Sequence, residues 1–273
     1  MSGTNKKGTA NGTPTAVLIG VTGGFGQALA RLLANEGFRL VLAARSENDA
    51  ATLTGRKDGS AIYVRADVSD PESLENLAAR SFEHLGQIDA VVNLAGVSPR
   101  KAMLEYTPAD VDSLLSINVK GPIFVTQAFL PRLLKQDGAG VVVHLGGAMD
   151  GRVGLPMMSA YAATRSALAG YVQASNRELD GTDVSLSFFG PAPANTESES
   201  AFFDMWRKMG TSLVEPEEVA AEILTTIRTR RRLHVMGGGM LRMMAFVNSI
   251  SPSAADAIGL RKFGKLVTKY SPR

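Results

Sequence analysis

Three closely spaced glycines have the arrangement of a phosphate-binding turn. Gly20, Gly24 and Gly26 lie in AVLIGVTGGFGQALA, where an apolar run passes into a helical pattern. The first glycine permits a tight turn, and the others let backbone amides approach a pyrophosphate at the positive end of the helix. Glycine-rich turns also occur for purely conformational reasons, but the position between strand and helix favours nucleotide binding. We expect Thr22 and Phe25, in the same turn, to border the same ligand.

An arginine indicates which dinucleotide this turn accepts. Arg45 follows the second apolar run, at the place where dinucleotide-binding proteins distinguish NAD from NADP. An acidic residue there would bind the ribose 2′-hydroxyl of NAD, whereas this chain has Ala44-Arg45. A guanidinium can pair bidentately with a 2′-phosphate. The sequence therefore predicts NADP(H) as the cofactor, the alternative being that Arg45 is a solvated surface residue.

Short apolar runs alternate with longer helical patterns along the chain, which indicates repeated βαβ units. We predict an α/β protein with a single Rossmann-type, doubly wound parallel sheet of about seven strands and helices on both faces. Strands of such a sheet are nearly continuous apolar runs because both faces are buried. Gly37 is expected to end the first helix. The expected strands are 16–19, 39–43, 61–65, 90–94, 141–145, 184–188 and 233–236, and the expected helices are 24–36, one beginning at Asp70-Pro71, 111–134 and 159–179.

The composition is that of a globular chain without disulfides. Apolar residues make up 45% and charged residues 20% of the 273 residues, close to the globular average. The absence of cysteine excludes disulfides, thiolate metal sites and cysteine nucleophiles, and we expect no metal site. The polar residues 1–14 lack the apolar stretch of a signal peptide, and no run of about 18 apolar residues occurs. We therefore expect a cytoplasmic protein.

The chain is expected to have three parts: a flexible tail at 1–14, the NADP-binding domain at 15–236 and a basic helical extension at 237–273 packed on the same domain. Residues 228–273 contain ten Lys or Arg residues and one acid, Asp256. The rest of the chain has no basic helix and no aromatic stacking set, so we expect no nucleic-acid partner.

Two apolar stripes in the extension allow two interpretations. A basic amphipathic helix can lie on an anionic membrane surface, which would be a peripheral contact without stable insertion. Packing on the domain or in an oligomer explains the same stripes, and we prefer it. The stripes are Met240, Met243, Met244 and Val247, and further on Phe263, Leu266, Val267 and Tyr270.

Six motifs in order make the chain similar to the short-chain dehydrogenases/reductases over roughly residues 15–236. They are the glycine turn, Asp67-Val68 after the third strand, Asn93-Leu94-Ala95-Gly96 after the fourth, Asn118 in SINVKGPIF, Tyr161 before AATR, and Phe189-Gly190-Pro191 after the sixth. The resemblance implies a homodimer or homotetramer built through helices 111–134 and 159–179. It also implies further NADP(H) contacts from Asp67, Val68, Asn93, Ala95, Gly96, Tyr161 and Arg165.

The activity implied by this resemblance is hydride transfer between nicotinamide and a carbonyl or secondary alcohol. Tyr161 would be the general acid or base, with a pKa lowered by a neighbouring cation. That neighbour is Arg165, one helical turn away, where the family has lysine. Arginine keeps the charge and can contact the ribose, but it cannot titrate. Asn118 would support the site through water or backbone.

A second departure concerns the substrate oxygen. The family places a hydrogen-bonding serine thirteen residues before the tyrosine, but this chain has Ala148 there, preceded by Gly146-Gly147. Losing such a donor costs about two to three orders of magnitude in rate. His144 or Asp150 could substitute, although a strand histidine satisfied by local hydrogen bonds is the simpler interpretation of His144.

Residues 191–213 form a polar stretch with an apolar stripe, which either covers a moderately large apolar substrate or seats a short helix on the core. We predict an NADP(H)-dependent oxidoreductase acting on such a substrate. The altered serine and lysine positions keep an alternative open: the same fold used for non-redox chemistry (lyase, isomerase or cyclase) or for nucleotide-responsive binding. The stripe consists of Phe202, Phe203, Met205, Trp206 and Met209.

Overall fold

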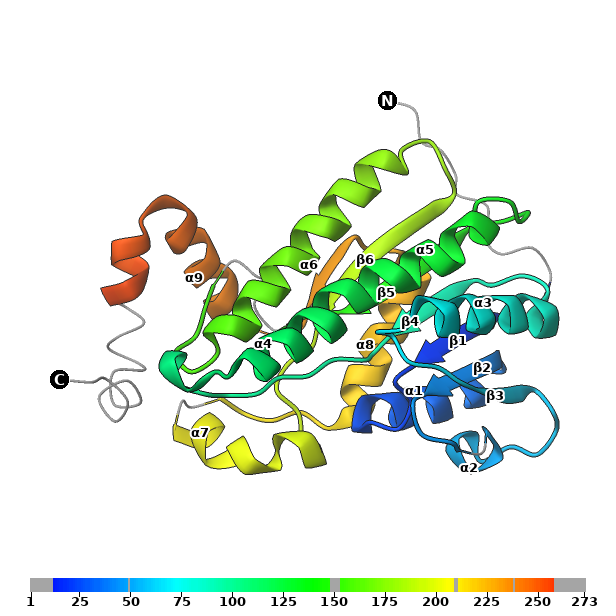
Figure 1. The fold of residues 1–273 in the computed structure, drawn as a ribbon, viewed down its shortest axis with the longest axis horizontal. Coiled ribbons are helices and arrows are strands. Elements are labelled where there is room, and N and C mark those ends of the chain that lie inside the picture. The colour runs from blue at the N-terminus through cyan, green and yellow to red at the C-terminus, as the bar shows by residue number, and fades with distance from the viewer. Residues whose placement is uncertain (1–11, 49, 148–152, 209–210, 238, 258–273) are drawn as a thin grey trace.

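Seven parallel strands form the centre of the structure, as predicted (Figure 1). The computed structural model describes residues 12–48, 50–147, 153–208, 211–237 and 239–257. The strand order is β3-β2-β1-β4-β5-β6-β7, and each neighbouring pair is parallel. The strands are β1 (Thr15–Ile19), β2 (Arg39–Ala44), β3 (Ala61–Arg65), β4 (Ala90–Asn93), β5 (Gly140–Leu145), β6 (Val184–Gly190) and β7 (Leu233–Val235).

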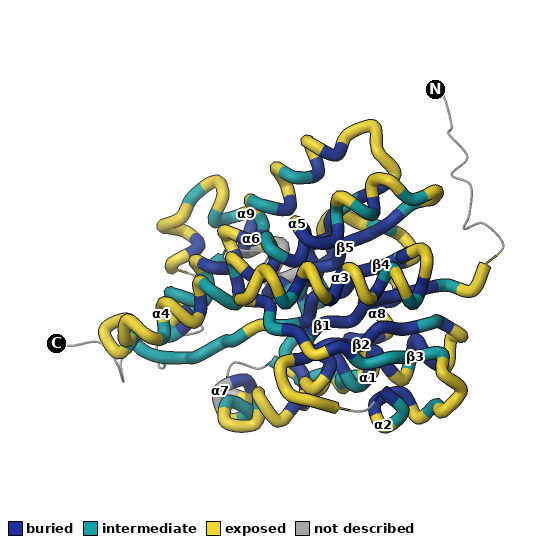
Figure 2. The backbone as a smooth tube through the Cα atoms, turned by 45° about the vertical axis from the view of Figure 1, so that its right-hand side comes forward, coloured by how far each residue is buried: buried dark blue, intermediate teal, exposed yellow. Residues whose placement is uncertain are grey.

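Both faces of the sheet are buried, which explains the apolar runs. Every residue of β1 and β4 is buried, and burying one large apolar side chain stabilises the fold by about 1.5–3 kcal/mol. One core joins the sheet to α1 (Gly24–Asn35) and α8 (Pro216–Thr229), and the other joins it to α3 (Pro71–Leu85), α5 (Gly121–Leu133) and α6 (Ser159–Glu178). Figure 2 shows the dark, buried strands between these helices.

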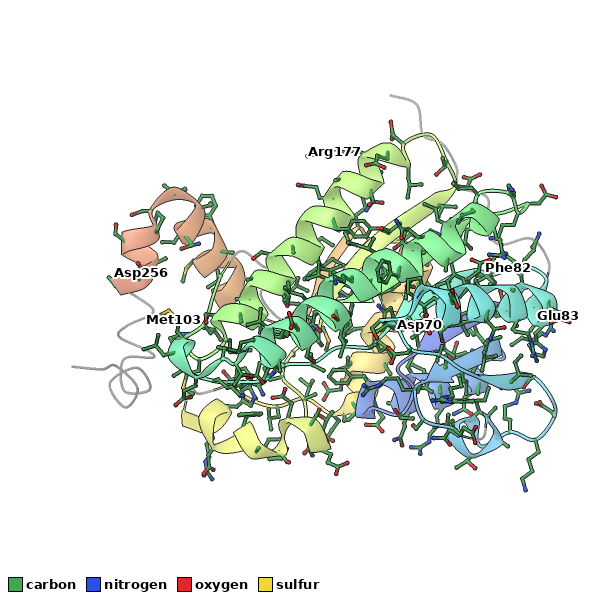
Figure 3. The ribbon with its side chains drawn as sticks, viewed as in Figure 1. Asp70, Phe82, Glu83, Met103, Arg177 and Asp256 are labelled. Carbon is green, nitrogen blue, oxygen red and sulfur yellow. The ribbon has the colours of Figure 1, made fainter. Side chains whose placement is uncertain are left out.

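Most helix ends follow from signals in the sequence. The side chain of Asp70, labelled in Figure 3, accepts a hydrogen bond of 3.0 Å from the Glu72 N–H and caps α3. Gly37 ends α1 with φ +82°, as predicted. Helix α8 was not among the predicted helices, although Glu215 and Glu218 form a capping box at its start. The shorter elements are α2 (Ala50–Thr54), η1 (Met103–Glu105), α4 (Pro108–Leu115), η3 (Glu197–Phe202), α7 (Phe203–Lys208) and α9 (Gly239–Ile250).

The helix predicted at 111–134 is not continuous. A π-helical turn, η2 (Ser116–Lys120), separates α4 from α5. Pro122 has no N–H, so the carbonyl of Asn118 cannot receive the α-helical hydrogen bond from the residue four positions on. The Gly121 N–H reaches back five residues to the Ser116 carbonyl. Such π-turns are frequent at functional sites.

The C-terminal extension begins with α9, which Figure 1 shows beside one end of α6. In the first apolar stripe, Met243 is 53% exposed and Val247 is half-buried, and the side chains of Met240 and Met244 lie outside the described residues. The second stripe, from Phe263 onward, lies outside the described residues. Among the residues that are described, no helix has both the length and the apolar character needed to cross a bilayer.

Candidate active site

A cavity of about 490 Å³ lies at the carboxyl ends of the strands, where the strand order reverses between β1 and β4. Ligands bind at this switch point in open α/β sheets, because the loops that leave neighbouring strands diverge there. The cavity brings together seven of the predicted cofactor residues. They are Gly20, Thr22, Arg45, Asp67, Val68, Ala95 and Gly96.

The glycine turn is shaped by close backbone approaches. Gly20 has φ +86°, and a Cβ there would lie 2.8 Å from the Ala95 nitrogen. A Cβ on Gly26 would lie 2.5 Å from the Val21 Cα, so the start of α1 packs directly on the turn. The turn therefore presents backbone to the cavity, with the N-terminus of α1 behind it, which is the arrangement that holds a pyrophosphate.

Six predicted cofactor residues do not belong to the described lining of the cavity: Gly24, Phe25 and Gly26 of the turn, and Asn93, Tyr161 and Arg165. Gly24 instead lies under the chain that follows β6, because a Cβ on it would be 2.8 Å from the Thr196 Cγ2. Phe25 is half-buried and packs against the core. Gly24, Phe25 and Gly26 therefore support the turn from behind and do not face the cavity.

Arg45 and Asp67 stand at one side of the cavity. Arg45 is exposed, as a residue that receives a ligand phosphate must be. Burial alone would raise the pKa of Asp67, but the Ser69 N–H and hydroxyl (2.9 and 2.7 Å) and the Arg45 charge bring that pKa below its ordinary value. The carboxylate is thus ionised at neutral pH and partly balances the arginine.

Asn93 supports the loop after β4. Its side-chain oxygen accepts a hydrogen bond of 3.1 Å from the Ala95 N–H, and the residue is 1% exposed. Its buried Nδ2 has no partner within the described part of the chain. An unpaired buried donor costs about 1–3 kcal/mol, so this group fits a site that a bound dinucleotide completes.

Asn118 holds the same loop from the other side. Its side-chain oxygen accepts from the Val97 N–H at 3.0 Å, and its Nδ2 donates to the Val97 carbonyl at 2.8 Å and to the Thr164 hydroxyl at 3.3 Å. The side chain is fully buried and its groups are used internally. Its main-chain carbonyl, in the π-turn, lacks the usual α-helical donor because Pro122 has no N–H, which fits a role through the backbone.

Tyr161 and Arg165 share one face of α6, and the arginine reaches the cofactor loop. The Arg165 guanidinium carbon lies 4.7 Å from the centre of the Tyr161 ring. Arg165 is 4% exposed, and its Nη1 donates to the Leu145 carbonyl at 3.1 Å. A Cβ on Gly96 would lie 2.9 Å from Arg165 Nη2 and 3.5 Å from Asn118 Oδ1. Arg165 and Asn118 therefore meet at Gly96, which lines the cavity, and the Tyr161 ring lies beside Arg165.

The corner after β5, where the family has its serine, is made of backbone. A Cβ on Gly147 would lie 3.0 Å from the Tyr161 hydroxyl and 3.3 Å from Arg165 Cγ, whereas a Cβ on Gly146 would overlap the Phe188 ring. Position 147 thus faces the tyrosine hydroxyl without supplying a donor side chain. Ala148 and Asp150 lie outside the described residues.

His144 does not belong to the site. It is fully buried in β5, and its Nε2 is 2.9 Å from the Thr126 hydroxyl. Burial lowers the pKa of His144 to about 3, so the ring is neutral at physiological pH. The Nε2 has a local partner, as the simpler interpretation expected, whereas the buried Nδ1 has none in the described part of the chain. In the part of the chain that is described, no group of three or more His, Asp or Glu side chains could hold a metal ion.

The stripe in 191–213 forms η3 and α7. Trp206 is 6% exposed and packs against Val153, Leu155, Phe202 and Leu213, so it seats the short helix on the rest of the structure. The side chains of Met205 and Met209 lie outside the described residues. No motif in the sequence indicated that the Arg100 side chain, which pairs with Glu199 of η3, is buried beneath this stripe.

Comparison with known proteins assigns the family. The sequence model described as "short chain dehydrogenase" matches residues 14–205. The chain belongs to this family. An uncharacterized oxidoreductase of Staphylococcus epidermidis is 31% identical over 181 residues, which cover 66% of this chain and 78% of the relative. The matched residues include Tyr161 and Arg165, and the relative is named as an oxidoreductase.

Two solved structures have the same fold. A short-chain dehydrogenase/reductase from Burkholderia phymatum in complex with NAD has a TM-score of 0.77 at 23% identity and covers 89% of this chain and 95% of its own. A short-chain dehydrogenase from Burkholderia cenocepacia in complex with NADP has a TM-score of 0.76 at 20% identity, with coverages of 91% and 98%. The fold accommodates either dinucleotide, so the choice depends on local residues.

Proposed function

We propose that this short-chain dehydrogenase is an NADP(H)-dependent oxidoreductase that transfers a hydride between nicotinamide and a carbonyl or secondary alcohol of a moderately large apolar substrate. The observation that carries the proposal is the placement of Arg165 and Asn118 against Gly96 of the switch-point cavity, with the Tyr161 ring beside Arg165. A proton-transferring hydroxyl, a fixed cation and a dinucleotide cradle are the parts that this reaction needs.

The residues around the cavity fit a dinucleotide. The turn at Gly20 and the start of α1 would hold the pyrophosphate, Asp67 and Val68 would border the adenine, and Arg45 would pair with the 2′-phosphate of NADP(H). When bound, the nicotinamide supplies or accepts the hydride. Arg165 and the Asn93 amide would contact the half of the cofactor that lies toward Tyr161.

Tyr161 would hold or release the proton at its hydroxyl. Arg165 would place its positive charge beside Tyr161, because its guanidinium carbon lies 4.7 Å from the centre of the ring and the arginine is buried. An arginine does not give up its proton, so Arg165 would hold this charge without relaying a proton itself. Asn118 also keeps the cofactor loop in place through Val97.

The substrate oxygen would receive its main hydrogen bond from Tyr161. Position 147, the described residue of the β5 corner that faces this hydroxyl, has no side chain to add a second donor. A missing donor of this kind lowers kcat by about 10²–10³. We therefore expect a slower reductase than one that carries the family serine.

The replaced lysine and the missing serine also support a second candidate function. A buried arginine that cannot titrate and a glycine beside the tyrosine hydroxyl would also suit a protein that binds the nucleotide but performs non-redox chemistry, or none. One comparison separates the candidates. NADPH consumption on a panel of carbonyl compounds should be measurable in wild type and nearly abolished in Tyr161→Phe, with NADPH affinity unchanged by calorimetry. A wild type that binds NADPH but never oxidises it would leave the non-redox candidate.

The organisation of the chain is part of the proposal. Residues 15–236 would form the cofactor-binding domain, the polar residues 1–14 a flexible tail, and 237–273 a basic extension packed on the domain. We place the protein in the cytoplasm without a nucleic-acid partner. A homodimer or homotetramer would form through α4, α5 and α6; the exposed Val111 and Leu115 on α4 support this face.

A further inference from the structure

The loop after β4, residues 94–101, is clamped along its whole length. Asn118 holds Val97, and the Tyr106 hydroxyl donates to the Pro99 carbonyl at 3.0 Å. The Lys101 N–H donates to the Met157 carbonyl, also at 3.0 Å. At its start, this loop carries the cavity residues Ala95 and Gly96. Hydrogen bonds thus hold the loop at Val97, Pro99 and Lys101, between the cofactor cavity and its far end.

At that far end, Arg100 is buried in the segment after β6. The guanidinium Nη2 lies 2.7 and 2.8 Å from the two carboxylate oxygens of Glu199, and the Arg100 side chain is 4% exposed. The guanidinium carbon stands 4.0 Å from the centre of the Phe202 ring and 5.3 Å from that of Trp206. The Trp206 indole N–H donates to Glu199 at 2.8 Å. One arginine thus holds an acid and two aromatic rings together.

Residues 197–208, which comprise η3 and α7 and are called the cover segment below, also pack on the chain that leads to the catalytic helix. Trp206 contacts Val153 and Leu155, which lie between β5 and α6. The cover segment therefore touches the chain that follows β4, β5 and β6. All of these connections leave the carboxyl ends of the strands, where the substrate must meet the cofactor; Figure 1 shows α7 at that end of the molecule.

We propose that Arg100 is a positioning residue that fastens the cover segment to the cofactor-binding loop, so that filling the cofactor cavity orders the substrate side of the site. This inference rests on the proposed function and adds to it a positioning residue that joins the cofactor side of the site to the cover segment. Coupling of this kind is reciprocal, because whatever orders loop 94–101 stabilises the cover segment and the reverse holds to the same extent. The matched control is the exposed ion pair between Arg207 and Asp204, which lies on α7 with Trp206 and joins residues of that helix alone.

The chain's single tryptophan makes the cover segment directly observable. Because Trp206 is the only tryptophan, its emission and its quenching by acrylamide report on this segment alone. In wild type, NADP⁺ should lower the quenching. In Arg100→Gln, quenching without cofactor should rise several-fold and NADP⁺ should no longer change it, whereas Arg207→Gln should behave as wild type.

Three further measurements distinguish positioning from a loss of folding. Circular dichroism checks the fold of Arg100→Gln, and the double variant Arg100→Met/Glu199→Gln leaves no uncompensated charge in the buried site. Arg100→Lys keeps the ion pair but not the stacking, and it should restore part of the wild-type behaviour. In the active enzyme, substrate KM should rise about five-fold or more while kcat changes less, and NADP⁺ affinity should fall by a similar factor.

The possible results of these experiments test the fastening by Arg100, its coupling to the cofactor and the proposed function separately. Equal quenching of Trp206 in wild type and in both loss variants would overturn the fastening. If wild type binds NADP⁺ in a calorimeter without any change at Trp206, the coupling is wrong while the proposed function stands. A wild type that binds no NADP⁺ would refute the proposed function and the coupling with it. A fall in kcat at constant KM in Arg100→Gln would also contradict a positioning role.

Discussion

Gly147 offers the sharpest test of how the substrate oxygen is bound. A Cβ at this position would lie 3.0 Å from the Tyr161 hydroxyl, so a serine there would bring a second hydroxyl beside that of the tyrosine, one residue before the position of the family serine. We predict that Gly147→Ser raises kcat for reduction of a simple carbonyl. Gly147 is the suitable position because a side chain on it would face the Tyr161 hydroxyl, whereas a side chain on Gly146 would collide with the Phe188 ring.

The size of the effect follows from two opposing contributions. A donor aimed at developing negative charge contributes about 10²–10³ in kcat, or about 2.7–4 kcal/mol. The contacts at 3.0 Å to Tyr161 and 3.3 Å to Arg165 require a shift of a few tenths of an ångström, and overpacking of this kind costs about 1–3 kcal/mol. A misplaced hydroxyl loses part of the gain, so we expect a net increase of about ten-fold, which corresponds to about 1.4 kcal/mol.

The matched control is Gly147→Ala, which adds the same Cβ without the hydroxyl. Both variants should lose a similar amount of thermal stability, and only the serine variant should gain turnover, followed as NADPH absorbance under saturating cofactor. Equal turnover in the serine and alanine variants would refute the reasoning, because the hydroxyl would then have no access to the substrate oxygen.

Three other predictions follow from the structure. Arg45→Ala should weaken NADP(H) binding and leave NAD(H) binding nearly unchanged in calorimetry; equal wild-type affinity for both would remove the basis for NADP(H). Leu115→Glu should shift the light-scattering mass toward the monomer, and a wild type that is already monomeric at all concentrations would contradict the proposed oligomer. His144 has its pKa lowered to about 3 in the folded state against about 6.5 when unfolded, so protons bind the unfolded chain first and stability falls as pH drops below 6.5. The contribution is about 1.4 kcal/mol per pH unit, and His144→Gln should flatten urea-unfolding free energies measured between pH 7 and 5.

The fold was predictable because its strongest signal is local. Strands buried on both faces must be short apolar runs, so the expected strands agree with β1 to β7 to within two residues at each end. The break between α4 and α5 was missed, although Pro122 was a visible cause. Helix α8 was overlooked despite the apolar spacing from Val219 to Ile227 that follows Glu215-Pro216.

The candidate site divides in the same way. Motif order predicted that the glycine turn and the loop after β4 share one cavity, because these motifs follow strands whose ends meet, and Arg165 of the Tyr161 region reaches Gly96 in that loop. The pair of Arg100 and Glu199 could not be predicted, since 99 residues separate its members and neither stands in a motif. The same holds for the approach of Gly147 to the Tyr161 hydroxyl, which depends on how the β5 corner packs against α6.

The proline at position 122 changes how alanine scanning of this site should be interpreted. Asn118→Ala would release the Val97 backbone and leave the Asn118 carbonyl where it is, so a loss of activity would report on the loop and not on the carbonyl. The Asn118 carbonyl lacks its usual α-helical donor because the residue four positions on, Pro122, has no N–H. The substitution that addresses it is therefore Pro122→Ala, which restores an N–H to α5 and lets the helix take up the carbonyl, with every side chain around the cavity unchanged.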